Sequence, residues 1–451
     1  MTSPRFAVPL ADIDDCFQGI VPSAIASTSP EGVPNVTELS IVYRVDDEHV
    51  ALSRQFFSKT IANLQANPRA SLVLIEPQSG RQFRLDLAYE RTEMDGPLFD
   101  RMSARLEAVA SQTGMSKVFK LAAADICRVL QCSAVPVDHD IPPPDRTPVD
   151  LKKVDLISRR ITSANTEDEL LTVSLEVLAH EFGYEHSFIM LVDEGEQRLY
   201  TVASHGYDES GVGSEVLFGD GVLGVAAQRR ETISLSHVPS DLTYNRTVRS
   251  GFESTEEAAN IEQEISLPGL ANVYSQHVVP IEARDRLLGL LCFESEQPGQ
   301  FRFIDDFVFH LAAREIGLAL ILLRADPVRT TGVVAQLSPE IADAAPAAQL
   351  RHYAADDSIF IDNEYLIKGV AGRVLWRLLQ SYVEERRVDF TNKEIRLDAS
   401  LELPDIKDNL EARLALLRRR LEDRCAFLRI SSTGRGRIRL DVTRELTLRE
   451  A

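Results

Sequence analysis

A short polar run, Ser58-Lys59-Thr60, opens a predicted helix and could bind a phosphate group. A helix N-terminus offers free backbone N–H groups, and this run adds two hydroxyls and an ammonium group. Ser53 and Thr37 lie on predicted strands that precede the helix in the sequence. We therefore predict that these five residues bind a phosphate-bearing cofactor.

A second group of residues that could bind a ligand lies on a predicted helix near residue 415. Leucines at i, i+4, i+7 and i+11 form one apolar face for a core, and a polar, basic stripe runs beside it. Guanidinium groups contact guanine edges and phosphates, so the stripe and a basic hairpin tip predict DNA binding. Asp408 and Glu411 would repel phosphate, which leaves a protein partner as the alternative. The predicted DNA-binding residues are Asn409, Arg413, Arg420, Arg424, Arg435 and Arg437.

A long polar segment, residues 236–268, predicts a ligand lid in the middle of the chain. Loops of this length in compact domains are usually functional or disordered. We predict that aromatic and basic side chains in and around it line a pocket for an anionic or aromatic ligand. The predicted ligand-binding residues are His205, Tyr207, Tyr244, Arg249, Tyr274 and His277.

Two other motifs give only weak evidence for a binding site. Gly219, Gly221 and Gly224 have dinucleotide-binding spacing, but a polar loop follows the next helix where a parallel strand would be required. His180 and His186 are six residues apart, so they do not share a helix face as a zinc pair would. We predict no metal site and assign no catalytic residue.

Two linkers predict three modules. Residues 136–150 hold five prolines and should form a stiff spacer, and residues 326–352 are rich in Ala and Pro with little apolar periodicity. Short strands dominate the first module, and helices flanking an antiparallel sheet are predicted for the second. The predicted modules are 1–135, 151–325 and 353–451.

The first module resembles the pyridoxamine-phosphate-oxidase-like split barrels over about residues 14–132. The resemblance rests on Gly19-Ile20-Val21-Pro22, on the hairpin through Gly32, and on Ser58-Lys59-Thr60. It implies a split β-barrel and a homodimer that binds FMN, or in some branches haem, at the subunit interface. Glu38 stands where the oxidase presents basic residues, which argues against substrate turnover.

The second module resembles GAF domains over about residues 154–324. Glycines 219, 221 and 224, the run Val279-Pro280-Ile281, and Glu294-Ser295 carry this resemblance. It implies an α/β sandwich with an antiparallel sheet, which holds a small molecule between the sheet and its covering loops.

The third module resembles the winged helix-turn-helix effector domain of response regulators over about residues 360–442. The similar segments are Leu417-Arg418-Arg419-Arg420-Leu421 and Thr433-Gly434-Arg435-Gly436. The complete chain is thus expected to be a multidomain α+β protein.

The charge of the chain is uneven. Its 451 residues carry a net charge of −20, whereas residues 369–440 hold 16 Lys and Arg against 11 Asp and Glu. Only the C-terminal module is therefore suited to a polyanion. Five scattered cysteines, an acidic start and the absence of a long apolar run predict a soluble, cytoplasmic protein without membrane contact.

Three functions are consistent with these features. The leading expectation is a ligand- or redox-sensing, homodimeric transcriptional regulator that binds DNA and a small-molecule effector. The second is an FMN-dependent oxidoreductase regulated by a GAF domain. The third is a haem- or tetrapyrrole-binding sensor, with His205 or His277 as candidate ligands.

Overall fold

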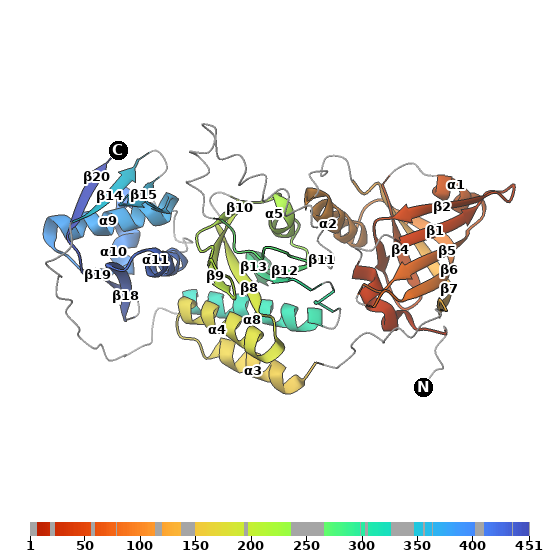
Figure 1. The fold of residues 1–451 in the computed structure, drawn as a ribbon, viewed down its shortest axis with the longest axis horizontal. Helices are drawn as coiled ribbons and strands as arrows, with labels where there is room; N and C mark the ends of the chain where they lie inside the picture. The colour runs from red at the N-terminus through yellow and green to blue at the C-terminus, as the bar shows by residue number, and fades with distance from the viewer. Residues whose placement is uncertain are drawn as a thin grey trace.

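The computed structural model describes residues 7–18, 23–55, 59–77, 79–112, 120–136, 149–193, 197–235, 266–297, 299–302, 305–325, 347–354, 357–362, 364–401, 410–434 and 436–450. They form three units in chain order, which lie in a row (Figure 1). Within these ranges no helix has the length and hydropathy needed to cross a membrane.

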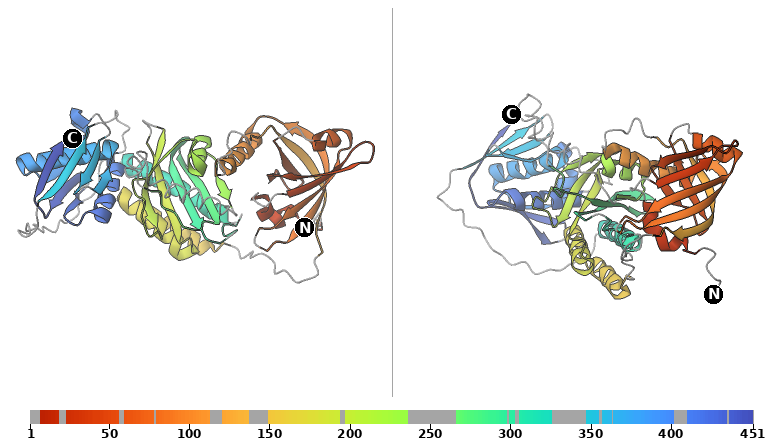
Figure 2. Two further views of the ribbon diagram at one scale, coloured as in Figure 1. Left: turned by 45° about the horizontal axis from the view of Figure 1, so that its top comes forward. Right: turned by 45° about the vertical axis from the view of Figure 1, so that its right-hand side comes forward.

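The N-terminal unit is a curled seven-stranded antiparallel sheet in the order β2-β1-β5-β6-β7-β4-β3 (Figure 2). Register shifts interrupt the pairing of its two longest strands, β6 and β7, and such bulges bend a sheet. The elements are η1 (Leu10–Gln18), β1 (Ser23–Thr28), β2 (Pro34–Leu39), β3 (Val42–Arg44), β4 (His49–Arg54), α1 (Lys59–Ala66), β5 (Arg69–Ile75), β6 (Gln82–Glu93), α2 (Pro97–Gln112) and β7 (Ala123–Ala134).

The central unit has a six-stranded antiparallel sheet in the order β10-β9-β8-β13-β12-β11. Helices α4 and α8 pack on its strands, α3 packs on both helices, and α5 contacts β12 and β13 through a separate hydrophobic core. The elements are α3 (Leu151–Thr162), α4 (Glu167–Phe182), β8 (His186–Asp193), β9 (Arg198–His205), β10 (Glu215–Leu217), α5 (Gly221–Arg229), β11 (Ile233–Leu235), β12 (Ser275–Ala283), β13 (Arg286–Ser295) and α8 (Asp306–Ala325).

The C-terminal unit combines two small sheets with three α-helices. One sheet has the order β16-β15-β14-β20, with β14 and β20 parallel, and the other has the order β17-β19-β18. The elements are β14 (Ala348–Tyr353), β15 (Ser358–Ile361), β16 (Glu364–Ile367), α9 (Gly369–Glu385), β17 (Asp389–Thr391), α10 (Asn392–Leu397), η3 (Ala399–Leu401), α11 (Leu410–Arg424), β18 (Leu428–Gly434), β19 (Arg437–Val442) and β20 (Leu446–Glu450).

The start of this unit differs from the predicted boundary. Strand β14 begins at Ala348, inside the segment predicted as a linker, and pairs with β15 and β20. Its alternate residues Ala348, Leu350 and His352 are buried, a period-two pattern too short to stand out in an Ala-rich sequence. The C-terminal unit therefore includes at least these residues.

Helix α2 joins the first two units. Its Met102 and Leu106 pack into a core with barrel strands, while Ala108 is fully buried among the side chains of α5. Glu107 also accepts two hydrogen bonds from Arg229 of α5, at 2.9 and 3.1 Å. One helix thus contributes to two hydrophobic cores.

Candidate functional sites

The barrel holds a cavity of about 170 Å³ between strands β1, β2 and β4 and helix α1. Three residues predicted to bind a cofactor, Thr37, Ser53 and Thr60, line it together. The Thr60 hydroxyl accepts a hydrogen bond from Asn35 Nδ2 at 3.0 Å, and the Ser53 hydroxyl accepts one from the Ile41 amide at 3.0 Å. Both hydroxyls are therefore held in place.

The other two residues predicted to bind the cofactor, Lys59 and Ser58, are not among the described residues that line this cavity. Lys59 is exposed at the first turn of α1, and Ser58 lies outside the described residues. Sequence reasoning missed Arg54 and Gln55, which also line the cavity. The buried Nε2 of Gln55 has no hydrogen-bond partner. Because both follow directly on Ser53, extending the predicted set along that strand would have found them.

The donor set of this cavity fits one end of a phosphate-bearing cofactor such as FMN. It offers four hydroxyls, with Ser40 as the fourth, a guanidinium group and the unsatisfied Gln55 amide. Its volume is well below the roughly 300–1,000 Å³ of pockets that enclose a ligand of drug size. The rest of such a cofactor would have to lie outside this cavity.

The cavity also carries negative charge. Glu38 and Asp125 line it, and Asp125 lies 3.6 Å from the Nε of Arg54. Burial raises the pKa of Asp125, while a hydrogen bond from Thr92 and the charge of Arg54 lower it. These carboxyl groups distinguish the cavity from a purely cationic phosphate site.

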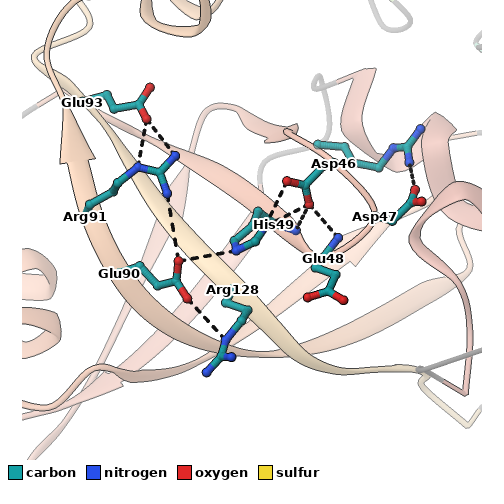
Figure 3. Close-up of polar contacts among 9 residues, drawn as sticks. Asp46, Asp47, Glu48, His49, Glu90, Arg91, Glu93 and Arg128 are labelled. Carbon is teal, nitrogen blue, oxygen red and sulfur yellow. Dashed lines mark hydrogen bonds and ion pairs between the residues drawn. The ribbon is translucent and has the colours of Figure 1, made fainter.

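The polar side chains of one network on the barrel surface form hydrogen bonds and ion pairs with one another (Figure 3). His49 Nδ1 lies 2.9 Å from Asp46 Oδ1, and His49 Nε2 lies 3.4 Å from Glu90 Oε2. Glu90 also pairs with Arg128, whose Nε is 3.3 Å away. Since these groups are matched with one another across β4, β6 and β7, the network has a structural role.

In the central unit the predicted ligand residues separate onto two faces of the sheet. His205 and His277 lie in one row across the strands, through the pairs His205–Ser187, Ser187–Phe293 and Phe293–His277. Both rings meet residues of the helices that pack on this sheet, His180 of α4 and Phe309 of α8.

Tyr207 and Tyr274 lie elsewhere. Tyr207 packs edge-on against Phe188, whose cluster includes the side chains of α5, so it belongs to the opposite face. Tyr274 is exposed at 43 % just before β12. Tyr244 and Arg249 lie outside the described residues. The described members of the predicted set therefore do not form one pocket.

His277 is completely buried among aromatic rings. Its centroid is 4.6 Å from that of Phe309, and neither ring nitrogen has a hydrogen-bond partner. Burial lowers the pKa of His277 to about 3, so its ring is neutral. This packing leaves no room for a porphyrin beside the ring, which removes His277 as a haem ligand in this conformation.

His205 instead lines a cavity of about 310 Å³ between the central and C-terminal units. Thr172 and Glu176 of α4 form one side, and Arg419 and Asp423 of α11 form another. The sequence did not indicate that His205 would face a helix more than 200 residues away.

The glycines at the start of α5 have a packing role. A Cβ atom at Gly224 would stand 2.2 Å from the carbonyl oxygen of Leu217 in β10, which only glycine avoids. Gly219 and Gly221 have positive φ angles of 87° and 59°. These glycines form a tight strand-to-helix turn whose strand, β10, is antiparallel to β9. A dinucleotide-binding βαβ unit is absent from this described region.

Helix α11, predicted to contact DNA, is buried over much of its length and exposed at its end. Arg413 and Arg420 are only 7 % and 5 % exposed, while Arg424 and Arg437 are exposed to solvent. The Nε of Arg420 donates to the carbonyl oxygen of Leu366 at 2.8 Å. Asn409 and Arg435 lie outside the described residues. The predicted stripe is thus split between buried and exposed positions.

Metal-ligating side chains do not gather in the part of the chain that the structure describes. No three His, Cys, Asp or Glu side chains there are close enough to hold an ion. All five cysteines are buried and unpaired with one another.

Two family models match the chain. Residues 11–129 match pyridoxamine 5′-phosphate oxidase, and residues 164–320 match the GAF domain. No curated protein sequence matches the chain.

Solved structures also match parts of the chain. The GAF domain of an Acinetobacter phosphoenolpyruvate-protein phosphotransferase is 22 % identical, with a TM-score of 0.31, covering 39 % of this chain and 94 % of its own. A free methionine-R-sulfoxide reductase from Neisseria meningitidis is 18 % identical, with a TM-score of 0.30, covering 39 % and 90 %. An FMN-binding protein from Syntrophomonas wolfei is 15 % identical, with a TM-score of 0.25, covering 29 % and 88 %.

Proposed function

Because the chain joins a pyridoxamine 5′-phosphate oxidase-type split barrel to a GAF domain, we propose that it is a ligand- or redox-sensing regulator that binds DNA through a C-terminal winged helix. The observation that carries this proposal is the element order of the C-terminal unit. Strands β14–β16 precede α9, the short strand β17 leads into α10, and the basic helix α11 comes directly before the hairpin β18–β19. This is the order of a winged helix-turn-helix.

Local structure supports the same reading. A capping box fixes the start of α10, where Thr391 Oγ1 accepts from the Glu394 amide and Glu394 accepts from the Thr391 amide. Arg437, at the base of the hairpin tip, and Arg424, at the end of α11, are exposed. They offer guanidinium groups to a phosphate backbone.

A binding measurement tests this proposal. Fluorescence anisotropy with duplex DNA from upstream of the protein's own coding region would be recorded between 50 and 200 mM salt. Arg437→Ala should weaken binding and lower the salt slope by about 1, because one phosphate contact is lost. Arg159→Ala, at an exposed position on α3, is the matched control. Salt-independent or absent DNA binding would contradict the proposal.

A second candidate function, flavin binding, is favoured by the barrel cavity. Thr37, Ser53 and Thr60 would hold the phosphate-bearing end, and the free Gln55 amide would donate to it. A bound flavin would supply redox chemistry, which suits either a redox sensor or a flavin-dependent oxidoreductase. The small cavity is consistent with a homodimer in which a second copy covers the remainder.

Absorbance spectra test flavin binding. Protein incubated with FMN and then desalted should retain the visible flavin bands. Gln55→Ala should reduce retention, because it removes a buried donor that lacks a partner. Gln82→Ala, at an exposed position on β6, should retain as much flavin as the wild type. A colourless wild-type protein would rule this candidate out.

A further inference from the structure

Helix α11 is buried at every position from Arg413 to Leu417, while its last turn, residues 422–424, is exposed. Leu410, Leu414 and Leu417 face the core of the C-terminal unit and are fully buried. The opposite side packs on α4 and β9 of the central unit, where Arg413 and Leu416 are less than a tenth exposed. A DNA-reading helix has to leave one side open to the major groove. In this conformation that side is occupied.

Polar contacts from the central unit hold the basic side chains of α11. Arg419 donates from Nε to Asp168 Oδ1 at 2.9 Å and from Nη2 to Thr172 Oγ1 at 2.8 Å. Arg413 Nη2 lies 3.4 Å from both carboxylate oxygens of Asp193.

These carboxylates make the same kind of contact that phosphates would make. A guanidinium group binds either anion with its planar fork of N–H donors, so Asp168 and Asp193 compete with a nucleic acid for the same side chains. The loop before β10 adds another contact, because Ser210 Oγ donates to Asp423 Oδ2 at 2.5 Å.

The interface is also incompletely packed. The cavity of about 310 Å³ lies within it, and Glu422 and Asp423 on its rim are exposed. The contact also has an apolar part, because buried side chains of the two units belong to one hydrophobic cluster. Separating the units therefore has to expose apolar surface as well as break ion pairs.

We propose that the GAF module masks α11, using Asp168 and Asp193 in place of DNA phosphates, so that DNA binding requires the two units to separate. This inference rests on the proposed DNA-binding function and adds its regulation. It makes the closed form self-inhibited, and any effector that favours separation becomes an activator of DNA binding.

The test compares the full-length wild type with Asp168→Asn/Asp193→Asn. Both substitutions keep side-chain shape and remove the competing charge. The variant should bind the upstream DNA at least tenfold more tightly, and amide hydrogen exchange in α11 should become faster without DNA. Asp155→Asn, which removes an exposed α3 carboxylate paired with Arg159, is the control and should change neither.

The outcomes separate this inference from the function on which it rests. Unchanged exchange in α11 would show that the two carboxylates do not hold the helix. Faster exchange with equally tight DNA binding by wild type and variant would overturn masking and leave DNA binding intact. No DNA binding by either protein, despite faster exchange, would overturn DNA binding and masking together.

Discussion

Individual charged residues at the boundary between barrel and GAF module are poorly compensated. Asp306 Oδ1 has no hydrogen-bond partner and lies 3.5 Å from His277 Nε2. Arg105 of α2 donates to the carbonyl oxygen of Phe17 at 3.1 Å, but its Nε and Nη2 have no partner. Burial raises the pKa of Asp306 to about 7, although the charge of Arg105 opposes the shift. This boundary should therefore respond to pH near neutrality.

Replacing Asp306 tests this response. Its pKa in the folded state lies above the ordinary value of 3.8, so folding favours the protonated form. Its contribution to stability is complete below about pH 4 and is lost as the pH rises through 7. Asp306→Asn should therefore gain in Tm relative to the wild type between pH 5 and pH 8, by roughly 2–4 °C. Calorimetry at several pH values measures the difference.

The exposed Asp95→Asn variant is the control for this experiment, since it changes the same group in solvent. Its Tm difference from the wild type should stay constant across the pH range. A constant difference for Asp306→Asn as well would mean that this carboxyl group titrates as it does in the unfolded chain.

Single residues also show which parts of the candidate sites the sequence could predict. Thr37, Ser53 and Thr60 were predicted together and share one cavity, because flanking strands bring them to the same helix. His205 and Tyr207 were grouped by sequence proximity, yet they occupy opposite faces of the central sheet. Side chains alternate between the two faces along a strand, but β9 ends at His205. Beyond the turn at Gly206 this alternation no longer predicts the face on which Tyr207 lies.

At the scale of elements, the sequence indicates the helix cap of α10. Thr391 and Glu394 have the spacing of a capping box in the sequence, and they form a complete capping box at the start of α10. The helix predicted to open at Ser58-Lys59-Thr60 corresponds to α1, Lys59–Ala66. Local side-chain chemistry decides these features, so a local pattern is sufficient to predict them.

Removing this cap should weaken the C-terminal unit. Thr391→Ala leaves the amide group of Glu394 without its side-chain partner and should lower the free energy of unfolding by about 1 kcal/mol. Urea unfolding of the full chain, followed by fluorescence of Trp376 on α9, measures the effect. Lys393→Ala, exposed on the same helix, is the matched control and should be neutral or slightly stabilising. Equal midpoints for both variants would contradict the role of the cap.

The burial of α11 was not predictable in this way. The leucine stripe showed the side that faces its own unit, and the arginines on the other side resembled a solvent-exposed face. Their partners Asp168 and Asp193 are more than 200 residues away in the sequence. A contact between units depends on long-range docking, which local periodicity does not encode.

At the scale of the whole molecule, the barrel leaves an edge strand uncovered. Every residue of β2 is at least partly exposed, and Val36 and Val33 are 69 % and 52 % exposed beside the cavity-lining Thr37. Exposed apolar side chains on a sheet edge favour pairing with another chain. This location matches the homodimer proposed above, in which a second copy would complete the cofactor site.

A charge on this strand tests the dimer. Val36→Lys should weaken self-association at least tenfold, because it places an ammonium group in the apolar contact. Sedimentation velocity over a range of concentrations measures the change. Val383→Lys, on α9 and 40 % exposed, is the control and should associate like the wild type. A monomeric wild type, or a dimer unaffected by Val36→Lys, would contradict dimerisation through β2.

Helix α2 has a consequence for how this protein can be divided. Since Ala108 fills part of the hydrophobic core around α5, a fragment that starts at the proline-rich linker would expose that core to water. The sequence boundary at residues 136–150 is therefore not a boundary for folding. Fusion or truncation experiments that place a cut there would yield a sensor module prone to aggregation, and the smallest well-behaved sensor fragment would begin upstream of Pro97.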